Sequence, residues 1–260
     1  MRAPLLRRLL GLTLSVSVCA AFAQLASAQT IQGFEPGDPA LTATSGDAGT
    51  KTTYETQAPP QGTTQYLITT IRSTDNEDSL TNQSGADAAT FLSYNTNIFF
   101  GNAPAGGDGS GILVPFTVGP TGALELTLQY DFLSNEPGQT TIRNDFAAYG
   151  IFDSLNALQG TVTKFVTVTS AGGALMPTFG DQSIFVFHSG ITTLHISLAG
   201  LAPGNYNLAL GVEDATPGAD HASGLLIDNI AIVVPEPSTI GLGIAGMALL
   251  MALRKRFKRA

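Results

Sequence analysis

The octapeptide ALELTLQY at residues 123–130 decides the fold class of this chain, because apolar and polar side chains alternate along its whole length. A strand with this period of two buries one face and exposes the other to water. The same alternation recurs in three further runs, at residues 65–71, 161–168 and 193–198. Turns rich in Gly, Pro and Asn separate the runs, and no convincing helical period lies between them. The sequence therefore predicts an all-β fold, a two-sheet antiparallel sandwich.

The segment before the strands has the three parts of a secretory signal peptide. Arginines lie within residues 1–8, an apolar stretch follows at residues 9–23, and the small residues Ala26 and Ala28 precede Gln29. We predict cleavage between Ala28 and Gln29, which makes residues 1–28 the signal peptide.

A second small-residue site, AFA at residues 21–23, is the alternative point of cleavage. Either cut removes Cys19, the one cysteine of the chain, so the mature protein has no disulfide. Its stability must then come from packing or from a metal ion rather than from cross-links.

The C-terminus contains a proline motif, an apolar run and a basic tail in that order. Residues 235–239 read PEPST, and the run from Ile240 to Leu253 carries no charge. A full bilayer crossing takes about 20 apolar residues, so we expect one short transmembrane helix that needs its flanking residues to complete the span. The basic residues after it are Arg254, Lys255, Arg256, Lys258 and Arg259. By the positive-inside rule they stay in the cytoplasm, which places the rest of the chain on the far side of the membrane.

This three-part tail resembles the PEP-CTERM sorting signal of bacterial exosortase substrates. The resemblance implies that an exosortase-type membrane protease recognises Val234, Pro235, Glu236, Pro237 and Ser238. Because the prolines oppose extension of a helix or strand, we expect an extended and accessible hinge here. What the resemblance further implies is release or transfer to the cell envelope, in bacteria that build an extracellular polysaccharide matrix.

Without its two ends the chain is strongly acidic. Residues 29–234 keep 4 of the 12 basic residues and 19 of the 20 acidic residues, a formal net charge of −15. Such a surface repels nucleic acids and attracts divalent cations. We therefore exclude nucleic acid as a partner and treat residues 29–234 as one exported domain, with residues 235–260 as the sorting signal.

Short motifs near both ends of this domain suggest a family for it. GFE occupies residues 33–35, LLIDNI occupies residues 225–230, and further pieces lie at residues 62–68 and 204–210. The arrangement resembles a carbohydrate-binding-module type jelly roll. The resemblance implies that Glu35 and Asp228 approach each other across the terminal strands and bind a structural calcium ion with backbone carbonyls. The alternative is that Glu35 is a solvated turn residue and that Asp228 caps a strand end.

Catalytic motifs are lacking. The chain has no nucleophile elbow and no HExxH motif, and His188, His195 and His221 lack the spacing of metal ligands. The carboxylates are numerous enough that a glycosidase pair stays open, but we predict that the protein is not an enzyme. We expect the acidic clusters at residues 144–145 and 213–214 to be solvated loops.

Carbohydrate binding is the main alternative function. The absence of tryptophan removes the strongest sugar platform, whereas Tyr94-Asn95 and Tyr206-Asn207 could supply weaker ones. Threonines that alternate within residues 161–169 raise ice binding as a remote alternative. We therefore predict a non-enzymatic cell-surface or extracellular-matrix protein, with a calcium-dependent polysaccharide-binding or adhesion module as the alternative.

Overall fold

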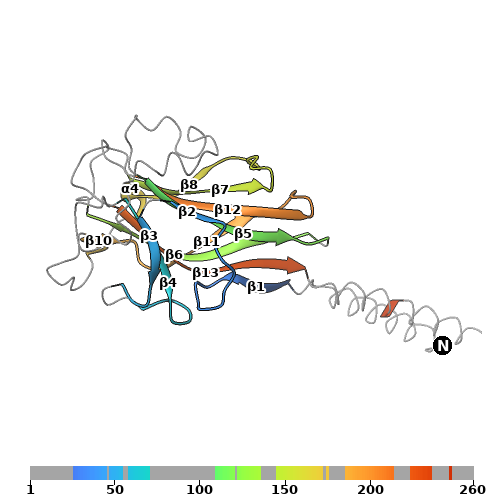
Figure 1. The fold of residues 1–260 in the computed structure, drawn as a ribbon, viewed down its shortest axis with the longest axis horizontal. Helices are drawn as coiled ribbons and strands as arrows, with labels where there is room; N and C mark the ends of the chain where they lie inside the picture. Colours follow the sequence, from blue (N-terminus) through green and yellow to red (C-terminus); the bar gives the residue numbers. More distant parts are fainter. Residues whose placement is uncertain are drawn as a thin grey trace, which may run out of the picture.

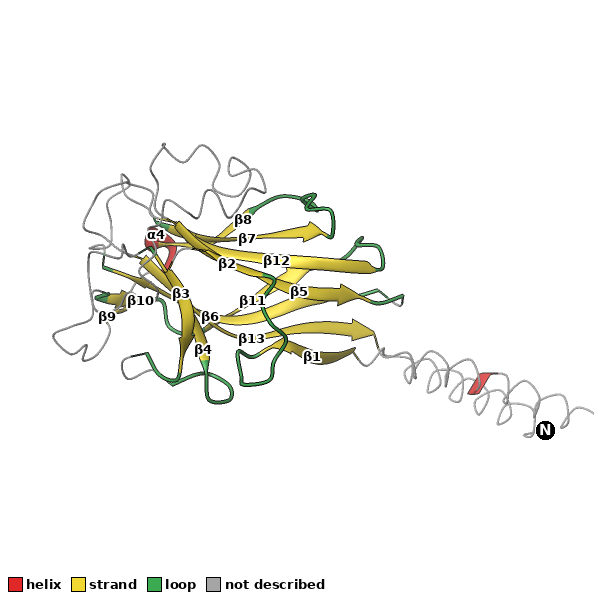
Figure 2. Cartoon of the chain, viewed as in Figure 1, coloured by secondary structure: helices red, strands yellow, loops and turns green. Residues whose placement is uncertain are grey.

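The computed structural model describes residues 26–45, 47–54, 58–70, 109–120, 122–135, 145–171, 174–175, 185–213, 223–235 and 246–247. Within these ranges the chain forms two antiparallel sheets, and the helix α4, Val168–Ala171, is a single turn. Figures 1 and 2 show the sheets as two layers. The predicted all-β, two-sheet antiparallel sandwich is confirmed at this level.

The larger sheet has the strand order β3-β4-β13-β6-β10-β9, with β1 paired to β13 and β11 paired to β6. Its two long strands are β13 (Ser223–Pro235) and β6 (Glu125–Ser134). The others are β1 (Ala26–Gln32), β3 (Asp47–Lys51), β4 (Gln65–Thr69), β9 (Ala174–Leu175), β10 (Phe187–His188) and β11 (Thr192–Ser197). One side of β13 pairs with β6, whereas the other side pairs with β4 over its first part and with β1 over its last part.

The smaller sheet has the strand order β2-β5-β12-β7-β8. Its strands are β2 (Ala43–Ser45), β5 (Gly109–Val118), β12 (Gly204–Glu213), β7 (Phe146–Asp153) and β8 (Thr163–Thr167). β12 pairs with β5 over its whole length, from Gly204 opposite Val118 to Glu213 opposite Gly109.

The core lies between the sheets and follows the alternation in the sequence. Along β6, Leu126, Leu128, Tyr130 and Phe132 all belong to the core and are at most 9% exposed. The side chains between them in the first part of the strand are only partly buried. Each fully buried side chain of this size contributes about 1.5–3 kcal/mol to folding. The predicted pattern is therefore confirmed for residues 125–130, whereas Leu124 precedes the strand and is 45% exposed.

β4 departs from the predicted pattern, because both of its faces are buried. Gln65 and Thr69, which we expected to face water, are 1% and 0% exposed. A second layer covers the outer face of the larger sheet at this point. In it the ring of Phe185 packs against Tyr54 with a centroid distance of 6.1 Å and lies directly over Gly224 of β13.

The strand ends define two poles of the sandwich. At the tail pole β1 begins and β13 ends, with Ala26 opposite Pro235. At the distal pole β13 begins, and the Ser223 hydroxyl donates to Asp145, just before β7, at 2.7 Å. Because β13 and β7 belong to different sheets, this bond joins the two layers at the distal pole.

The predicted processing sites lie at the tail pole where the structure describes them. β1 spans Ala26–Gln32, so the predicted cut between Ala28 and Gln29 falls within a strand. Val234 and Pro235 are extended, as predicted, but they end β13 and pair with β1 instead of forming a free hinge. Outside the described residues lie Glu236, Pro237, Ser238 and the basic residues Arg254, Lys255, Arg256, Lys258 and Arg259. No helix in the part of the chain that the structure describes is long and apolar enough to cross a membrane.

Candidate functional site

The predicted calcium ligand Glu35 lies in the loop that follows β1. Before it, Phe34 has a φ of 59°, a conformation that bulky side chains rarely adopt. Its ring is buried in the core against Tyr66, with a centroid distance of 4.9 Å, and its carbonyl accepts a hydrogen bond from the Thr64 hydroxyl. These contacts hold the strained residue in place and direct Glu35 out of the core. Backbone strain of this kind concentrates at functional sites.

Hydrogen-bond donors of the loop before β4 surround the Glu35 carboxylate. Its Oε1 accepts from the amides of Thr63 at 2.6 Å and Thr64 at 2.9 Å, and its Oε2 accepts from the Thr63 hydroxyl at 2.6 Å. The Thr63 hydroxyl, followed by the two amides, lowers the pKa of Glu35 below its ordinary value of 4.5. Gly62 makes room for the carboxylate, since a Cβ there would lie 2.1 Å from Oε1.

Asp228, the second predicted ligand, lies at a bulge in β13. The register with β6 shifts between Asp228 and Ala231, and Asn229 within the bulge has a φ of 50°. Asp228 is 1% exposed, and its two oxygens accept from the amides of Gln61 at 2.8 Å and Asn229 at 2.6 Å. Burial is the main reason that the pKa of Asp228 is raised above its ordinary value, and the nearby charges add to this effect. Asp228 and Glu35 both accept amides of the loop before β4, Asp228 from Gln61 and Glu35 from Thr63 and Thr64, so this loop connects the two carboxylates.

Asp38 is a third member of this site that the sequence analysis missed. Its Oδ2 accepts from the amides of Gly33 at 2.8 Å and Glu35 at 3.0 Å, and its charge also raises the pKa of Asp228. We call Glu35, Asp38 and Asp228 the acidic cluster. The one available signal was the turn-forming sequence PGD at residues 36–38, in which an Asp closes a loop through backbone amides.

The acidic cluster, as it stands, is a hydrogen-bonded link between the loop after β1, the loop before β4 and β13. All three carboxylates accept backbone amides, whereas a calcium ion needs six to eight oxygen ligands with lone pairs directed at it. Within the described ranges, no group of three or more His, Cys, Asp or Glu side chains could hold a metal ion. The link needs no cation in this geometry, and calcium at Glu35 and Asp228 stays a prediction.

A second buried carboxylate, Asp131 of β6, lies on the outer face of the same sheet. Its oxygens contact Nδ1 of His188 at 2.9 Å and accept from the Ser189 hydroxyl at 3.0 Å. The His188 side chain is 22% exposed and Asp131 only 1%. The sequence pattern does not reveal this contact, because the partner of His188 is 57 residues away in the chain. The contacts fix the segment after β10 against β6.

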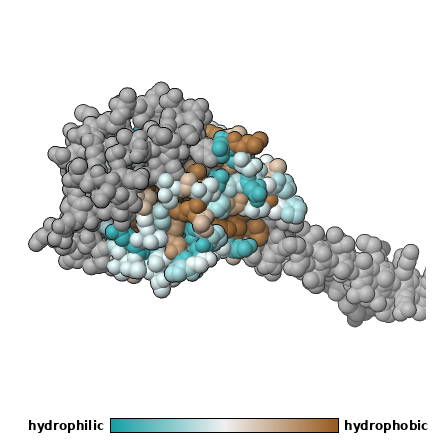
Figure 3. All heavy atoms as spheres, in the orientation of Figure 1, coloured by the Kyte–Doolittle hydropathy of each residue, from teal (hydrophilic) through white to brown (hydrophobic). Residues whose placement is uncertain are grey.

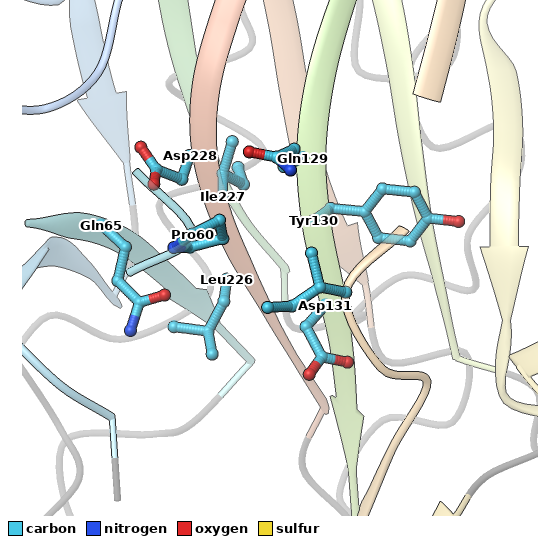
Figure 4. Close-up of a pocket in the computed structure, with 9 residues that line it drawn as sticks. Pro60, Gln65, Gln129, Tyr130, Asp131, Leu226, Ile227 and Asp228 are labelled. Carbon is cyan, nitrogen blue, oxygen red and sulfur yellow. The ribbon is translucent and has the colours of Figure 1, made fainter. Parts of the chain in front are cut away.

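Asp131 and Asp228 border one crevice, together with Pro60, Gln65, Gln129, Tyr130, Ile191, Leu226 and Ile227. Figure 4 shows that Asp131 and Asp228 lie on neighbouring strands and that their carboxylates point in different directions. The crevice is too narrow to admit a water molecule. It is therefore a packed seam between the sheet and its covering loops, with no space for a substrate.

Tyr206 does not present its ring to a sugar, which corrects one sequence prediction. The ring is 8% exposed, stacks on Phe116 in the core at 5.6 Å, and donates its hydroxyl to the Ala202 carbonyl at 2.8 Å. Tyr206 and its neighbours Asn205 and Asn207 all border a shallow depression of about 200 Å³ on the smaller sheet, but most of the tyrosine side chain is buried. The other candidate, Tyr94-Asn95, lies outside the described residues.

The carboxylates expected in solvated loops are also placed differently. Asp145 and Glu213 are 0% and 3% exposed, because both lie at the distal pole where strands of the two sheets meet. His195 is exposed on the polar face of its strand, β11, and its Nδ1 lies 3.3 Å from Oε2 of Glu125. Polar side chains at the distal pole thus serve the packing of the sandwich.

No protein-family model matches this sequence, and no curated protein resembles it significantly.

Proposed function

We propose that this chain is a non-enzymatic exported protein that an exosortase-type membrane protease sorts through its C-terminal motif. The acidic sandwich is first held at the inner membrane on the periplasmic side. Processing then releases it to the cell envelope or to an extracellular polysaccharide matrix. The role of the sandwich there is that of a surface or adhesion component.

The observation that carries the proposal is the position of the two chain ends. Ala26 lies opposite Pro235, so the segments that lead to the signal peptide and to the sorting signal leave the sandwich side by side. A precursor with a membrane segment at each end must present both ends to one membrane. A fold in which the ends leave from one pole allows this without any loss of the sandwich, as Figures 1 and 2 illustrate at the start of β1 and the end of β13.

The surface of the tail pole also suits a position next to a membrane. Leu124 is 45% exposed, and its amide donates to the carbonyl of Val233 at 2.8 Å, two residues before the end of β13. Leu155, in the turn after β7, is 87% exposed. In the face that Figure 3 presents, apolar surface appears among polar residues close to this end. Exposed apolar side chains are favourable at a lipid interface.

The proposal is tested by cell fractionation of the native host. The sorting variant replaces Pro235, Glu236 and Pro237 by alanine, and the matched control replaces Glu136 and Pro137, a second Glu-Pro pair of the chain. We expect wild type and control in the envelope or medium, and the sorting variant in the inner membrane. Equal distribution of all three proteins would refute sorting through this motif.

A second function, calcium-dependent polysaccharide binding, is suggested by the mutual repulsion of the carboxylates in the acidic cluster and by the Asn205–Asn207 depression. Glu35 and Asp228 would hold the ion, which would neutralise their mutual repulsion and tie the loop after β1 to β13. The test is calorimetry with CaCl₂, alone and followed by a polysaccharide of the host matrix. Heat of binding that Glu35→Ala abolishes supports a calcium site, whereas no heat and no Ca²⁺-dependent change in melting temperature excludes it.

A further inference from the structure

The pairing between β1 and β13 connects the two predicted processing sites directly. In the register of these strands, Ala26 lies opposite Pro235, Ser27 opposite Val234 and Ala28 opposite Val233. Signal cleavage after Ala28 would therefore remove the strand partners of Val233 and of the first two residues of the sorting motif, Val234 and Pro235.

The hydrogen bonds of this pair have a defined direction. The Val233 carbonyl accepts from the Leu124 amide at 2.8 Å and so points toward β6. Because successive residues of a strand direct their amides and carbonyls to opposite sides, the amide and carbonyl of Val234 point toward β1. In the register, their partner is Ser27. Loss of residues up to Ala28 therefore leaves the Val234 backbone without a strand beside it on that side.

The rest of the sandwich keeps its pairing after this cut. Gln29 stays opposite Ile232, Thr30 opposite Ala231 and Gln32 opposite Ile230. The opening is thus confined to the last residues of β13. Pro235 carries no amide hydrogen, so it limits how far any new strand could extend beyond Val234.

We infer that removal of the signal peptide after Ala28 creates the docking edge for the sorting protease, which adds an extended segment of its own beside Val234. This inference rests on the proposed function. Proteins commonly bind an extended peptide by adding it to an open sheet edge, where backbone hydrogen bonds supply affinity. An edge that β1 covers cannot accept a second strand, so signal removal must precede processing of the tail. The alternative cut after Ala23 leaves Ala26, Ser27 and Ala28 on the body and keeps the edge closed.

The test shifts the site of signal-peptide cleavage and measures the rate at which the C-terminal tail is then processed. The variant Ala26→Gln with Ala28→Gln removes both small residues required for cleavage after Ala28, so cleavage shifts to Ala23. We expect wild type to begin at Gln29 and to lose its basic tail. The variant begins at Gln24, and pulse-chase with intact-mass analysis shows tail processing slowed on the order of tenfold, the effect of two backbone hydrogen bonds that must first open.

A matched third variant adds Ser27→Pro to these two substitutions. Its mature chain is as long, but residue 27 can no longer donate to the Val234 carbonyl, and we expect tail processing to recover part of the way toward the wild-type rate. Hydrogen exchange of the purified chains gives an independent reading: the Val234 amide exchanges fast in the chain that begins at Gln29, and slowly in the variant that retains Ser27.

The outcomes separate this inference from the proposed function. Tail processing at equal rates in all three proteins, or equal exchange at Val234, overturns the docking edge and leaves exosortase sorting intact. Retention of the basic tail in all three proteins refutes the sorting function itself, and the inference with it.

Discussion

Replacement of Gly62 by alanine tests the acidic cluster at its tightest point. Gly62 has a φ of +69°, and a Cβ there would lie 2.1 Å from Oε1 and 2.7 Å from Cδ of Glu35. Non-bonded atoms do not approach one another this closely, so the Glu35 carboxylate must leave its position. It then loses the amides of Thr63 and Thr64, which it accepts at 2.6 and 2.9 Å.

Two effects add in this variant. Left-handed backbone costs a residue with a Cβ about 1 kcal/mol, which lowers the melting temperature of a domain of this size by about 2–4 °C. Loss of the hydrogen bonds to Glu35 lowers stability further. Gly122 provides the matched control, because its φ is +80° but nothing lies within 4 Å of the position of a Cβ. We expect Gly122→Ala to lose only the backbone contribution.

A double-mutant cycle isolates the contact with the carboxylate. In a Glu35→Ala background the clash is absent, so Gly62→Ala should cost about as much as Gly122→Ala, near 1 kcal/mol. The assay is urea unfolding of the four proteins, followed by circular dichroism. An equal cost of Gly62→Ala with and without Glu35 would refute the packing of Glu35 against Gly62, and with it the described cluster.

Four further predictions concern charge and packing. The pKa of Asp228 is raised in the folded state, so this residue stabilises the fold fully below its ordinary pKa of 3.8, and the stabilisation is lost as pH rises. In urea unfolding, the free energy of unfolding of Asp228→Asn relative to wild type should therefore be higher at pH 7 than at pH 3.5. The pKa of Glu35 is lowered in the folded state, so this residue stabilises the fold above its ordinary pKa of 4.5. The loss of unfolding free energy caused by Glu35→Gln should therefore grow from pH 3.5 to pH 7. If the stability difference from wild type changed with pH in the same direction for both variants, this assignment would be contradicted. Asp131→Ala should lose about 2 kcal/mol in thermal unfolding, because the donors it satisfies are left without an acceptor, and Asp131→Asn should lose less. Gly224→Ala places a Cβ 2.9 Å from the buried ring of Phe185 and should cost about 1–3 kcal/mol, whereas an unchanged melting temperature would show that this ring does not cover β13.

The local pattern of the sequence predicts those parts of the fold that depend on one strand and its two faces. Residues 123–130 alternate, and β6 buries Leu126 and Leu128 as that pattern requires. β4 instead contains three consecutive apolar residues, Tyr66, Leu67 and Ile68, and it is buried on both faces, because residues far away in the chain, such as Phe185, cover the larger sheet. Such a run is consistent with burial on both faces, but it does not identify the distant residues that form the covering layer.

The candidate functional site was likewise predicted only in part from the sequence. Glu35 and Asp228 were identified from short motifs, and in the structure both accept amides of the loop before β4. Gly62 was missed because its role depends on a contact with Glu35 in a separate loop, whereas Asp38 accepts amides of its own loop and had the PGD turn as its one signal. The pair formed by Asp131 and His188 was missed for the same reason, since a cross-strand contact has no fixed spacing in sequence.

The measurement that tests the central claim most directly is the intact mass of the wild-type protein recovered from the envelope or medium of its native host. We predict a chain that begins at Gln29 and has lost every basic residue from Arg254 onward. A chain that retains its basic tail and stays in the inner membrane would contradict the account and leave the tail as an ordinary anchor.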